Sequence, residues 1–246
     1  MIDKKSHIPL YEQLKDEIQR KIDRELKSGD SIPTELEIEK MYNVSRMTVR
    51  RAIHELVLEG VIQKKQGSGT FVQEPKIVHN VERITSFTEE MKEKGMILKT
   101  VSREINRIDN PSKKLVTKLN LSPFEKVIQI KRLRYVNNEP FIIMINYLRE
   151  KYVEGIKEKG LNKESLYDSL ENEYGIILER ADETLEARES TEFEAENLEI
   201  DIWSPVLYLE RLSYIKDNIP IEFTNVTIRG DKYKYNVSLY GRNKIK

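Results

Sequence analysis

Two helix-start signals close together along the chain constrain this sequence most strongly. Thr34-Glu35-Leu36-Glu37 has the form of a capping box, in which the Thr34 hydroxyl accepts from a backbone N–H three residues on and Glu37 reaches back. After a tight turn, Ser45 can cap a second helix over residues 46–58, whose apolar side chains share one face. The spacing predicts two short helices joined by a turn.

A third helix and a hairpin complete this unit. Apolar residues recur every four positions between Leu10 and Leu26, and Ser28-Gly29-Asp30 ends that helix. Residues 61–65 and 70–72, joined by the glycine-rich residues 66–69, are typical of two strands and a turn. The first part of the chain is therefore predicted to be a winged helix-turn-helix.

The pattern changes after a polar, proline-containing stretch at residues 73–76, so we predict domains at residues 1–75 and 76–246. The second domain alternates predicted strands with helices, and two tight turns join neighbouring strands, which indicates an α+β domain on a mostly antiparallel sheet. The predicted strands are residues 126–135, 141–148, 183–188, 206–216, 221–229 and 233–239. The predicted helices are residues 86–94, 112–119, 152–159, 165–173 and 192–198.

The composition excludes several kinds of chemistry. The 246 residues include no cysteine, which removes disulfides, thiolate nucleophiles and cysteine metal sites. The three histidines all lie in the first third of the chain, so no metal site, cofactor or catalytic residue is predicted. No apolar stretch reaches the roughly 20 residues of a membrane span, and the first residues lack the apolar segment of a signal peptide. We expect a cytoplasmic protein.

Local charge gives the first functional signal, because the whole chain balances 42 basic against 42 acidic residues. Basic residues outnumber acidic ones between residues 40 and 66: Lys40, Arg46, Arg50, Arg51, Lys64 and Lys65 against Glu55 and Glu59. The second helix of a helix-turn-helix enters the major groove with its N-terminal residues at the base edges, and here that end carries Ser45, Arg46, Thr48 and Arg50. A solvated basic face on an ordinary helical subdomain is the alternative.

Residues 8–72 resemble the DNA-binding domain of the GntR family. The resemblance rests on three motifs in this order: PLYEQLKDEIQRKI, GDSIPTELEIEKMYNVSRMTVRRAIHELVLEGVI and KKQGSGTFV. The resemblance places Thr34 and Glu35 near the phosphates and the wing tip, Gln66 and Gly67, at the minor groove. Together with the helix and wing residues, the predicted DNA-binding set is Thr34, Glu35, Ser45, Arg46, Thr48, Arg50, Arg51, Lys64, Gln66 and Gly67.

A second candidate site comes from the strand at residues 126–135. Its period of two places Ile128, Ile130, Arg132 and Arg134 on one face. Arginines that continue an apolar face toward the interior are costly unless anions meet them, and a ligand phosphate or carboxylate would do so. Structural ion pairs with acidic residues of the same domain are the alternative: Glu183, Glu186 or Glu222.

Residues 80–240 resemble the UTRA effector domain of HutC-type GntR proteins, which is similar to chorismate lyase in fold. The resemblance rests on ITSFTEEMKEKG, IKRLRYVNNEPFIIMINYL and PVLYLERLSYIKDNIPIEFTNVTIRGDKYKY. It implies an effector site made of Phe87, Thr88, Arg132, Arg134, Met144, Ser165, Tyr167 and Glu222. Met144 departs from the pattern, because many sugar-phosphate sensors of this type carry a glutamate there, so the ligand is expected to be less hydroxylated or held differently.

These features predict a transcriptional regulator, usually a repressor in this subfamily, that binds a palindromic double-stranded DNA operator as a homodimer. A small anionic effector such as a phosphorylated sugar would control its DNA affinity. Two other classes stay open: a chorismate-lyase-like enzyme domain fused to a DNA-binding head, and a ligand-independent DNA-binding dimer.

Overall fold

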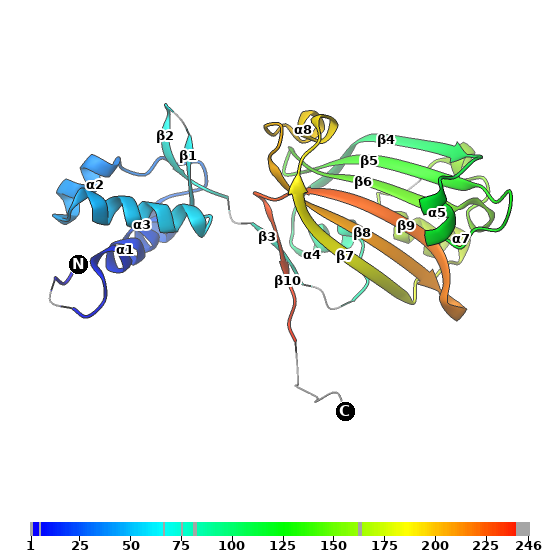
Figure 1. The fold of residues 1–246 in the computed structure, drawn as a ribbon, viewed down its shortest axis with the longest axis horizontal. Helices are drawn as coiled ribbons and strands as arrows, with labels where there is room; N and C mark the ends of the chain where they lie inside the picture. The colour runs from blue at the N-terminus through cyan, green and yellow to red at the C-terminus, as the bar shows by residue number, and fades with distance from the viewer. Residues whose placement is uncertain are drawn as a thin grey trace. The chain divides into compact units, whose positions relative to one another are not determined.

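The computed structural model describes residues 2–4, 6–65, 67–74, 76–80, 83–161 and 164–239. The chain divides into two compact units, Met1–Ile77 and Val78–Lys246, and each has its own core (Figure 1).

The first unit has the predicted order of three helices and a hairpin. Its elements are α1 (Leu10–Glu25), α2 (Glu35–Tyr42), α3 (Arg46–Leu58), β1 (Ile62–Lys65) and β2 (Gly69–Val72). The capping box at Thr34 is confirmed, since its hydroxyl accepts from the N–H of Glu37 and its own N–H donates to the Glu37 carboxylate at 2.8 Å. Ser45 caps α3, and Asn43 between the helices adopts the left-handed conformation with φ of 48°.

The apolar stripe of α1 packs against α3 to form the core of this unit. Leu14, Val49 and Leu56 are fully buried there. Ile62 of β1 and Val72 of β2 pair directly and join the same core, which fixes the hairpin to the helices. The unit therefore presents the start of α3 and the wing on a rigid support.

The second unit is built on one antiparallel sheet of six strands, β4-β5-β6-β9-β8-β7. The strands are β4 (Leu98–Ile108), β5 (Val127–Val136), β6 (Glu139–Arg149), β7 (Arg180–Glu189), β8 (Pro205–Ile215) and β9 (Ile219–Arg229). The helices are α4 (Phe87–Glu93), α5 (Lys113–Lys118), α6 (Ile156–Lys159), α7 (Leu166–Tyr174) and α8 (Glu192–Leu198), with 3₁₀ turns η1 (Glu150–Tyr152) and η2 (Lys216–Asn218). The predicted fold class is confirmed.

The sheet consists of two halves with the same order of elements, β4-α5-β5-β6 and β7-α8-β8-β9, which meet where β6 pairs with β9 (Figure 1). Each half ends in a tight hairpin. The turn residues Asn137 and Asn138, and likewise Asp217 and Asn218, have positive φ, which asparagine and aspartate tolerate better than other non-glycine residues. The two predicted hairpins are thus confirmed.

Helices cover both faces of the sheet. Leu115 and Leu119, at α5, pack on one face, and Leu198 of α8 packs on the same face. The opposite face receives α6 and α7, whose Ile156 and Leu170 are fully buried against it. This second face carries the even-numbered side chains of β5 and β6, including both arginines of the predicted site.

The structure differs from the prediction at several elements. Residues 152–159 do not form one helix, because Gly155 has φ of 77° and α6 begins only after it. The last strand, β10, ends at Asn236 instead of residue 239. The edge strand β4 was not predicted, since its side chains are half-buried or exposed and lack a continuous apolar face.

A two-stranded sheet pairs β3 (Ile77–Asn80), which was also not predicted, with β10 (Tyr233–Asn236). It joins the segment that follows the wing to the end of the second unit. None of the helices in the described ranges is both long and apolar enough to cross a membrane.

Candidate functional site

An open cavity lies on the sheet face that carries Arg132 and Arg134. Its lining comes from β5, β6, β8 and β9, from the starts of α4 and α7, and from the small β3-β10 sheet. Six of the predicted effector residues line it: Phe87, Thr88, Arg132, Arg134, Met144 and Tyr167. A concave lining that is mostly apolar, with a few polar groups among it, is typical of a site for a small molecule.

Arg132 and Arg134 are 3% and 1% exposed, and neither forms the alternative ion pairs with Glu183, Glu186 or Glu222 within the described residues. Burial lowers the pKa of Arg132 to about 10. Burial and the neighbouring charge of Arg132 together lower the pKa of Arg134 to about 9. Both therefore remain cationic at neutral pH. The Nε atom of each is buried without a hydrogen-bond partner.

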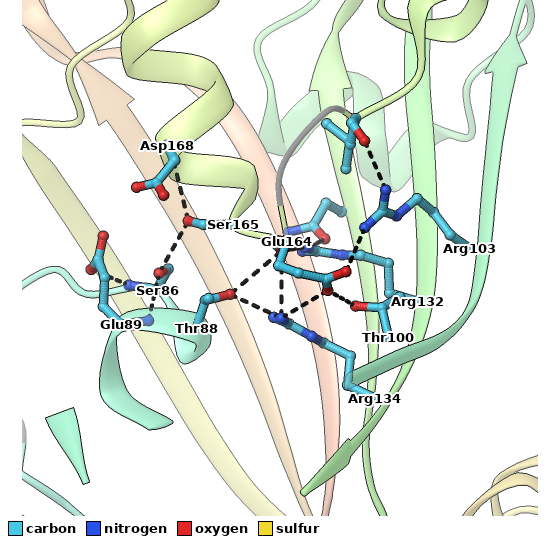
Figure 2. Close-up of polar contacts among 12 residues, drawn as sticks. Ser86, Thr88, Glu89, Thr100, Arg103, Arg132, Arg134, Glu164, Ser165 and Asp168 are labelled. Atoms are coloured by element: carbon cyan, nitrogen blue, oxygen red, sulfur yellow. Dashed lines mark hydrogen bonds and ion pairs between the residues drawn. The ribbon is translucent and has the colours of Figure 1, made fainter. Parts of the chain in front are cut away.

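Glu164 contacts both arginines through its backbone carbonyl and Arg134 also through its carboxylate (Figure 2). Its backbone carbonyl lies 3.5 Å from Arg132 Nη1 and 3.4 Å from Arg134 Nη2. Its carboxylate lies 3.7 Å from Arg134 and 3.6 Å from Arg103, and Thr100 donates to it at 2.5 Å. The side chain of Glu164 is 53% exposed, so these contacts compensate the buried charges only partly.

Thr88 and Ser165 lie at the starts of α4 and α7, and Thr88 contacts Arg134 (Figure 2). Arg134 Nη2 donates to Thr88 Oγ1 at 2.9 Å. Ser165 caps α7, and its hydroxyl lies 3.3 Å from the hydroxyl of Ser86, which caps α4. Ser165 is buried and does not belong to the cavity lining, so the structure places it behind the site rather than in it.

Glu222 lies beneath the cavity, where it is fully buried and not part of the lining. It accepts from Asn146 at 2.8 Å, from Ser213 at 2.9 Å and from Tyr167 at 3.1 Å. Asn146 in turn accepts from Arg132 at 2.8 Å. Glu222 therefore orients two lining residues, Asn146 and Tyr167, and its protein partners already occupy both of its oxygens. Burial and the Glu222 charge raise the pKa of Tyr167 to about 12, so its hydroxyl stays protonated.

Arg211 is a lining residue that the sequence reading missed. It donates to Tyr167 at 3.0 Å and pairs with Glu183 at 2.5 Å. Burial would lower the pKa of Arg211, but Tyr167 and Glu183 raise it above its usual value. The two halves of the sheet explain why Arg211 lines the cavity. Matching positions before the two hairpins are occupied by Arg132-Leu133-Arg134-Tyr135 and Arg211-Leu212-Ser213-Tyr214. That short repeat was the available signal.

Four further lining residues gave no local signal. They come from β3, α4 and β10: His79, Glu90, Tyr233 and Tyr235. Tyr233 donates to Glu90 at 2.9 Å, and His79 Nδ1 lies 2.9 Å from the same carboxylate. Their convergence depends on pairing between chain segments far apart in the sequence.

The first unit exposes the predicted DNA-reading residues at the start of α3. Arg46 and Arg50 have side chains 69% and 58% exposed. Glu35, at the first position of α2, lies 3.4 Å from Arg50 and 2.9 Å from Lys64 of the wing. These contacts lower the pKa of Glu35, chiefly through the hydrogen bond from Lys64. The carboxylate of Glu35 thus links Arg50 of α3 to Lys64 of β1.

Other predicted DNA-binding residues are placed differently. The Ser45 and Thr48 hydroxyls are hydrogen-bonded to each other at 2.8 Å at the α3 start. The Arg51 guanidinium lies 3.8 Å from the ring centroid of Tyr11 on α1, which gives it a partner inside the protein. Gly67 at the wing tip has φ of 73°, a conformation that disfavours other residues, and Gln66 lies outside the described residues.

Comparison with known proteins agrees with both units. The HTH-type transcriptional repressor NagR of Bacillus subtilis is 32% identical, over 95% of this chain and 96% of its own length. The mannosyl-D-glycerate transport/metabolism system repressor MngR of Escherichia coli is 28% identical, over 93% and 95%. Among solved structures, PhnF from Mycobacterium smegmatis has a TM-score of 0.65 and 26% identity, covering 93% of this chain and 100% of that one.

Two family models match the chain. The model described as bacterial regulatory proteins, gntR family, matches residues 10–72, and the UTRA domain model matches residues 95–234. Together they account for the helix-turn-helix unit and for most of the six-stranded unit with its cavity. The chain therefore belongs to the GntR family of bacterial regulatory proteins, with a GntR helix-turn-helix domain followed by a UTRA domain.

Proposed function

We propose that this protein is a transcriptional repressor that binds a palindromic operator as a homodimer and is controlled by a small anionic effector, such as a phosphorylated sugar. The observation that carries the proposal is the pair of buried arginines beside the cavity, Arg132 and Arg134. The cavity has a binding role in this proposal and no catalytic one. Operator binding places the protein in the cytoplasm.

The chemistry of the pair favours an anion with several acceptor oxygens. Two adjacent guanidinium groups that stay protonated in a buried site repel each other unless negative charge meets them. Phosphate and carboxylate groups match the forked donors of arginine. Thr88 and the unpartnered Nε atoms of both arginines offer additional polar contacts at the same place.

The DNA-binding part of the proposal rests on the exposed side chains at the start of α3. Arg46 and Arg50 lie on one face of the helix, one turn apart, where guanidinium groups can contact guanine edges or phosphates. A dimer is proposed because two such helices can then read half-sites about 34 Å apart on a palindrome.

The link between ligand and DNA affinity is proposed to run through β3. This strand begins at Ile77, shortly after β2 ends at Val72, and its His79 lines the cavity. A ligand that contacts His79, or the Tyr233 and Tyr235 side chains on the paired strand β10, acts directly on the segment that follows the DNA-binding unit. A coupling free energy of about 1–3 kcal/mol would be enough to change operator affinity severalfold.

The test separates the two units. A thermal-shift screen of the full-length protein against phosphorylated sugars and small carboxylic acids identifies ligands, and operator binding is then titrated with and without them. Arg50→Ala is expected to weaken operator binding at least tenfold with ligand affinity unchanged, and Arg134→Ala is expected to do the reverse. If both variants damage both activities equally, or if no anion binds, the proposal is wrong.

A further inference from the structure

The cavity contains one carboxylate among the described residues that line it, and that carboxylate belongs to Glu90 on α4. The side chain is 8% exposed. Around it the lining is aromatic, with the Phe87 ring centroid 6.3 Å from that of Tyr233. A single buried acid in a cavity that also holds three arginines has to be explained by what it binds.

The two oxygens of Glu90 differ in their contacts. Oε2 accepts from the Tyr233 hydroxyl at 2.9 Å and lies 2.9 Å from His79 Nδ1. Oε1 is buried and makes no hydrogen bond, and the Lys94 ammonium lies 4.0 Å from it, beyond hydrogen-bond distance. Because Oε2 is held from two neighbouring strands, the carboxylate cannot turn freely, and Oε1 keeps a fixed direction.

An unpartnered buried carboxylate oxygen costs free energy that a hydrogen-bond donor would recover. At the arginine end of the same cavity, hydrogen-bond acceptors are lacking instead, since Arg132 Nε and Arg134 Nε are donors without acceptors. A ligand that brings both an acceptor-rich anion and a donor group satisfies both ends at once.

The two ends are close enough for one small molecule to reach. Thr88, which accepts from Arg134, and Glu90 both belong to α4 and both line the cavity. The Arg134 guanidinium also lies 6.0 Å from the Phe87 ring centroid. Phe87 therefore lies near both the arginine end and the Glu90 end.

We propose that Glu90 is a specificity-determining residue of the effector site, whose Oε1 accepts a hydrogen bond from a hydroxyl or amino group of the ligand. This inference rests on the proposed function, since the arginines hold the ligand's anion. The effector class is thereby narrowed to phosphate esters or similar anions that carry such a donor. Met144, on the β6 side of the cavity, offers no comparable acceptor, so Glu90 selects which donor of the ligand is recognised.

The experiment uses the full-length protein and two kinds of probe. Inorganic phosphate tests the arginine end alone. A panel of hexose 6-phosphates and aminohexose 6-phosphates, each compared with the analogue in which one hydroxyl or amino group is replaced by hydrogen, tests both ends. Affinities are measured by calorimetric titration for the wild type, for Glu90→Gln and for Glu93→Gln. The last variant makes the same charge change on α4 at a residue whose side chain is 59% exposed and outside the lining.

The wild type is expected to bind at least one ester more tightly than inorganic phosphate. Glu90→Gln should weaken that ester at least tenfold, because a charge-assisted hydrogen bond is lost, and should change phosphate affinity less than twofold. The analogue without the recognised donor should bind the wild type and Glu90→Gln alike, and Glu93→Gln should behave as the wild type.

Three results would overturn the inference. They are an equal loss of phosphate and ester affinity in Glu90→Gln, no loss of either, or a panel in which nothing exceeds inorganic phosphate. In each case phosphate binding that Arg134→Ala abolishes would leave the proposed function standing. If inorganic phosphate and every ester fail to bind the wild type, the proposed function fails as well, so the two failures are distinguishable.

Discussion

Replacing Glu164 by glutamine should tighten the binding of an anionic effector, because this carboxylate competes with the ligand for the arginines. Its oxygens lie 3.7 Å from Arg134 and 3.6 Å from Arg103. An effector anion that takes its place at Arg134 has to break the first contact. Glutamine keeps the shape, the backbone carbonyl and an acceptor for Thr100, and it removes only the charge.

The size of the effect follows from the geometry. Two unit charges 3.7 Å apart attract by about 1 kcal/mol in water and by about 4 kcal/mol at an effective dielectric constant of 20. The Glu164 side chain is 53% exposed, so the lower figure applies, in line with the measured range for exposed ion pairs. A gain of about 1 kcal/mol corresponds to roughly fivefold tighter binding.

Calorimetric titration of inorganic phosphate into the wild type, Glu164→Gln and Glu171→Gln would measure this effect. Glu171 is an exposed carboxylate on α7, so its variant controls for the change in net charge. Tighter binding in Glu164→Gln alone supports the competition. Unchanged affinity, or weaker binding than in the wild type, would refute it and would make Glu164 either a bystander or a ligand contact.

Two further predictions concern the stability of the protein, and the first also tests whether Arg51 has a structural or a DNA-binding role. Arg51→Ala should lower the free energy of unfolding by about 0.5–1 kcal/mol, because the contact with Tyr11 is lost. Urea denaturation measures this change. An unchanged stability together with strongly reduced operator binding would instead make Arg51 a DNA contact. The pKa of Glu194 is lowered to about 2, since hydrogen bonds from Arg188, Thr191 and Thr227 outweigh burial, so its stabilisation is complete above pH 4.5 and lost as pH falls through about 2. Glu194→Gln should therefore lower the free energy of unfolding by about 3 kcal/mol at pH 7. The difference from the wild type, followed by the fluorescence of the single tryptophan, Trp203, should shrink below pH 4.5; a difference independent of pH would contradict this.

The sequence alone determined the elements whose signals are local. The capping box at Thr34, the tight turn that follows its helix and the apolar stripe of α1 depend on residues within one or two turns of each other, so their patterns could be interpreted without a structure. The same holds for the hairpin at Asn137 and Asn138, where positive φ restricts the residue types. The alternation along β5 likewise placed Arg132 and Arg134 together on one inward face.

The tertiary structure alone decided which polar groups meet in the cavity. Glu222 lies in a stretch whose sequence is typical of a buried strand. Only the pairing of β9 with β6 and β8 shows that Asn146 and Ser213 donate to its oxygens. His79 reaches the cavity because β3 pairs with β10 at the opposite end of the second unit. Such contacts join residues far apart in the sequence, and their free energy depends on burial and on orientation in three dimensions, which leave no periodic trace along the chain.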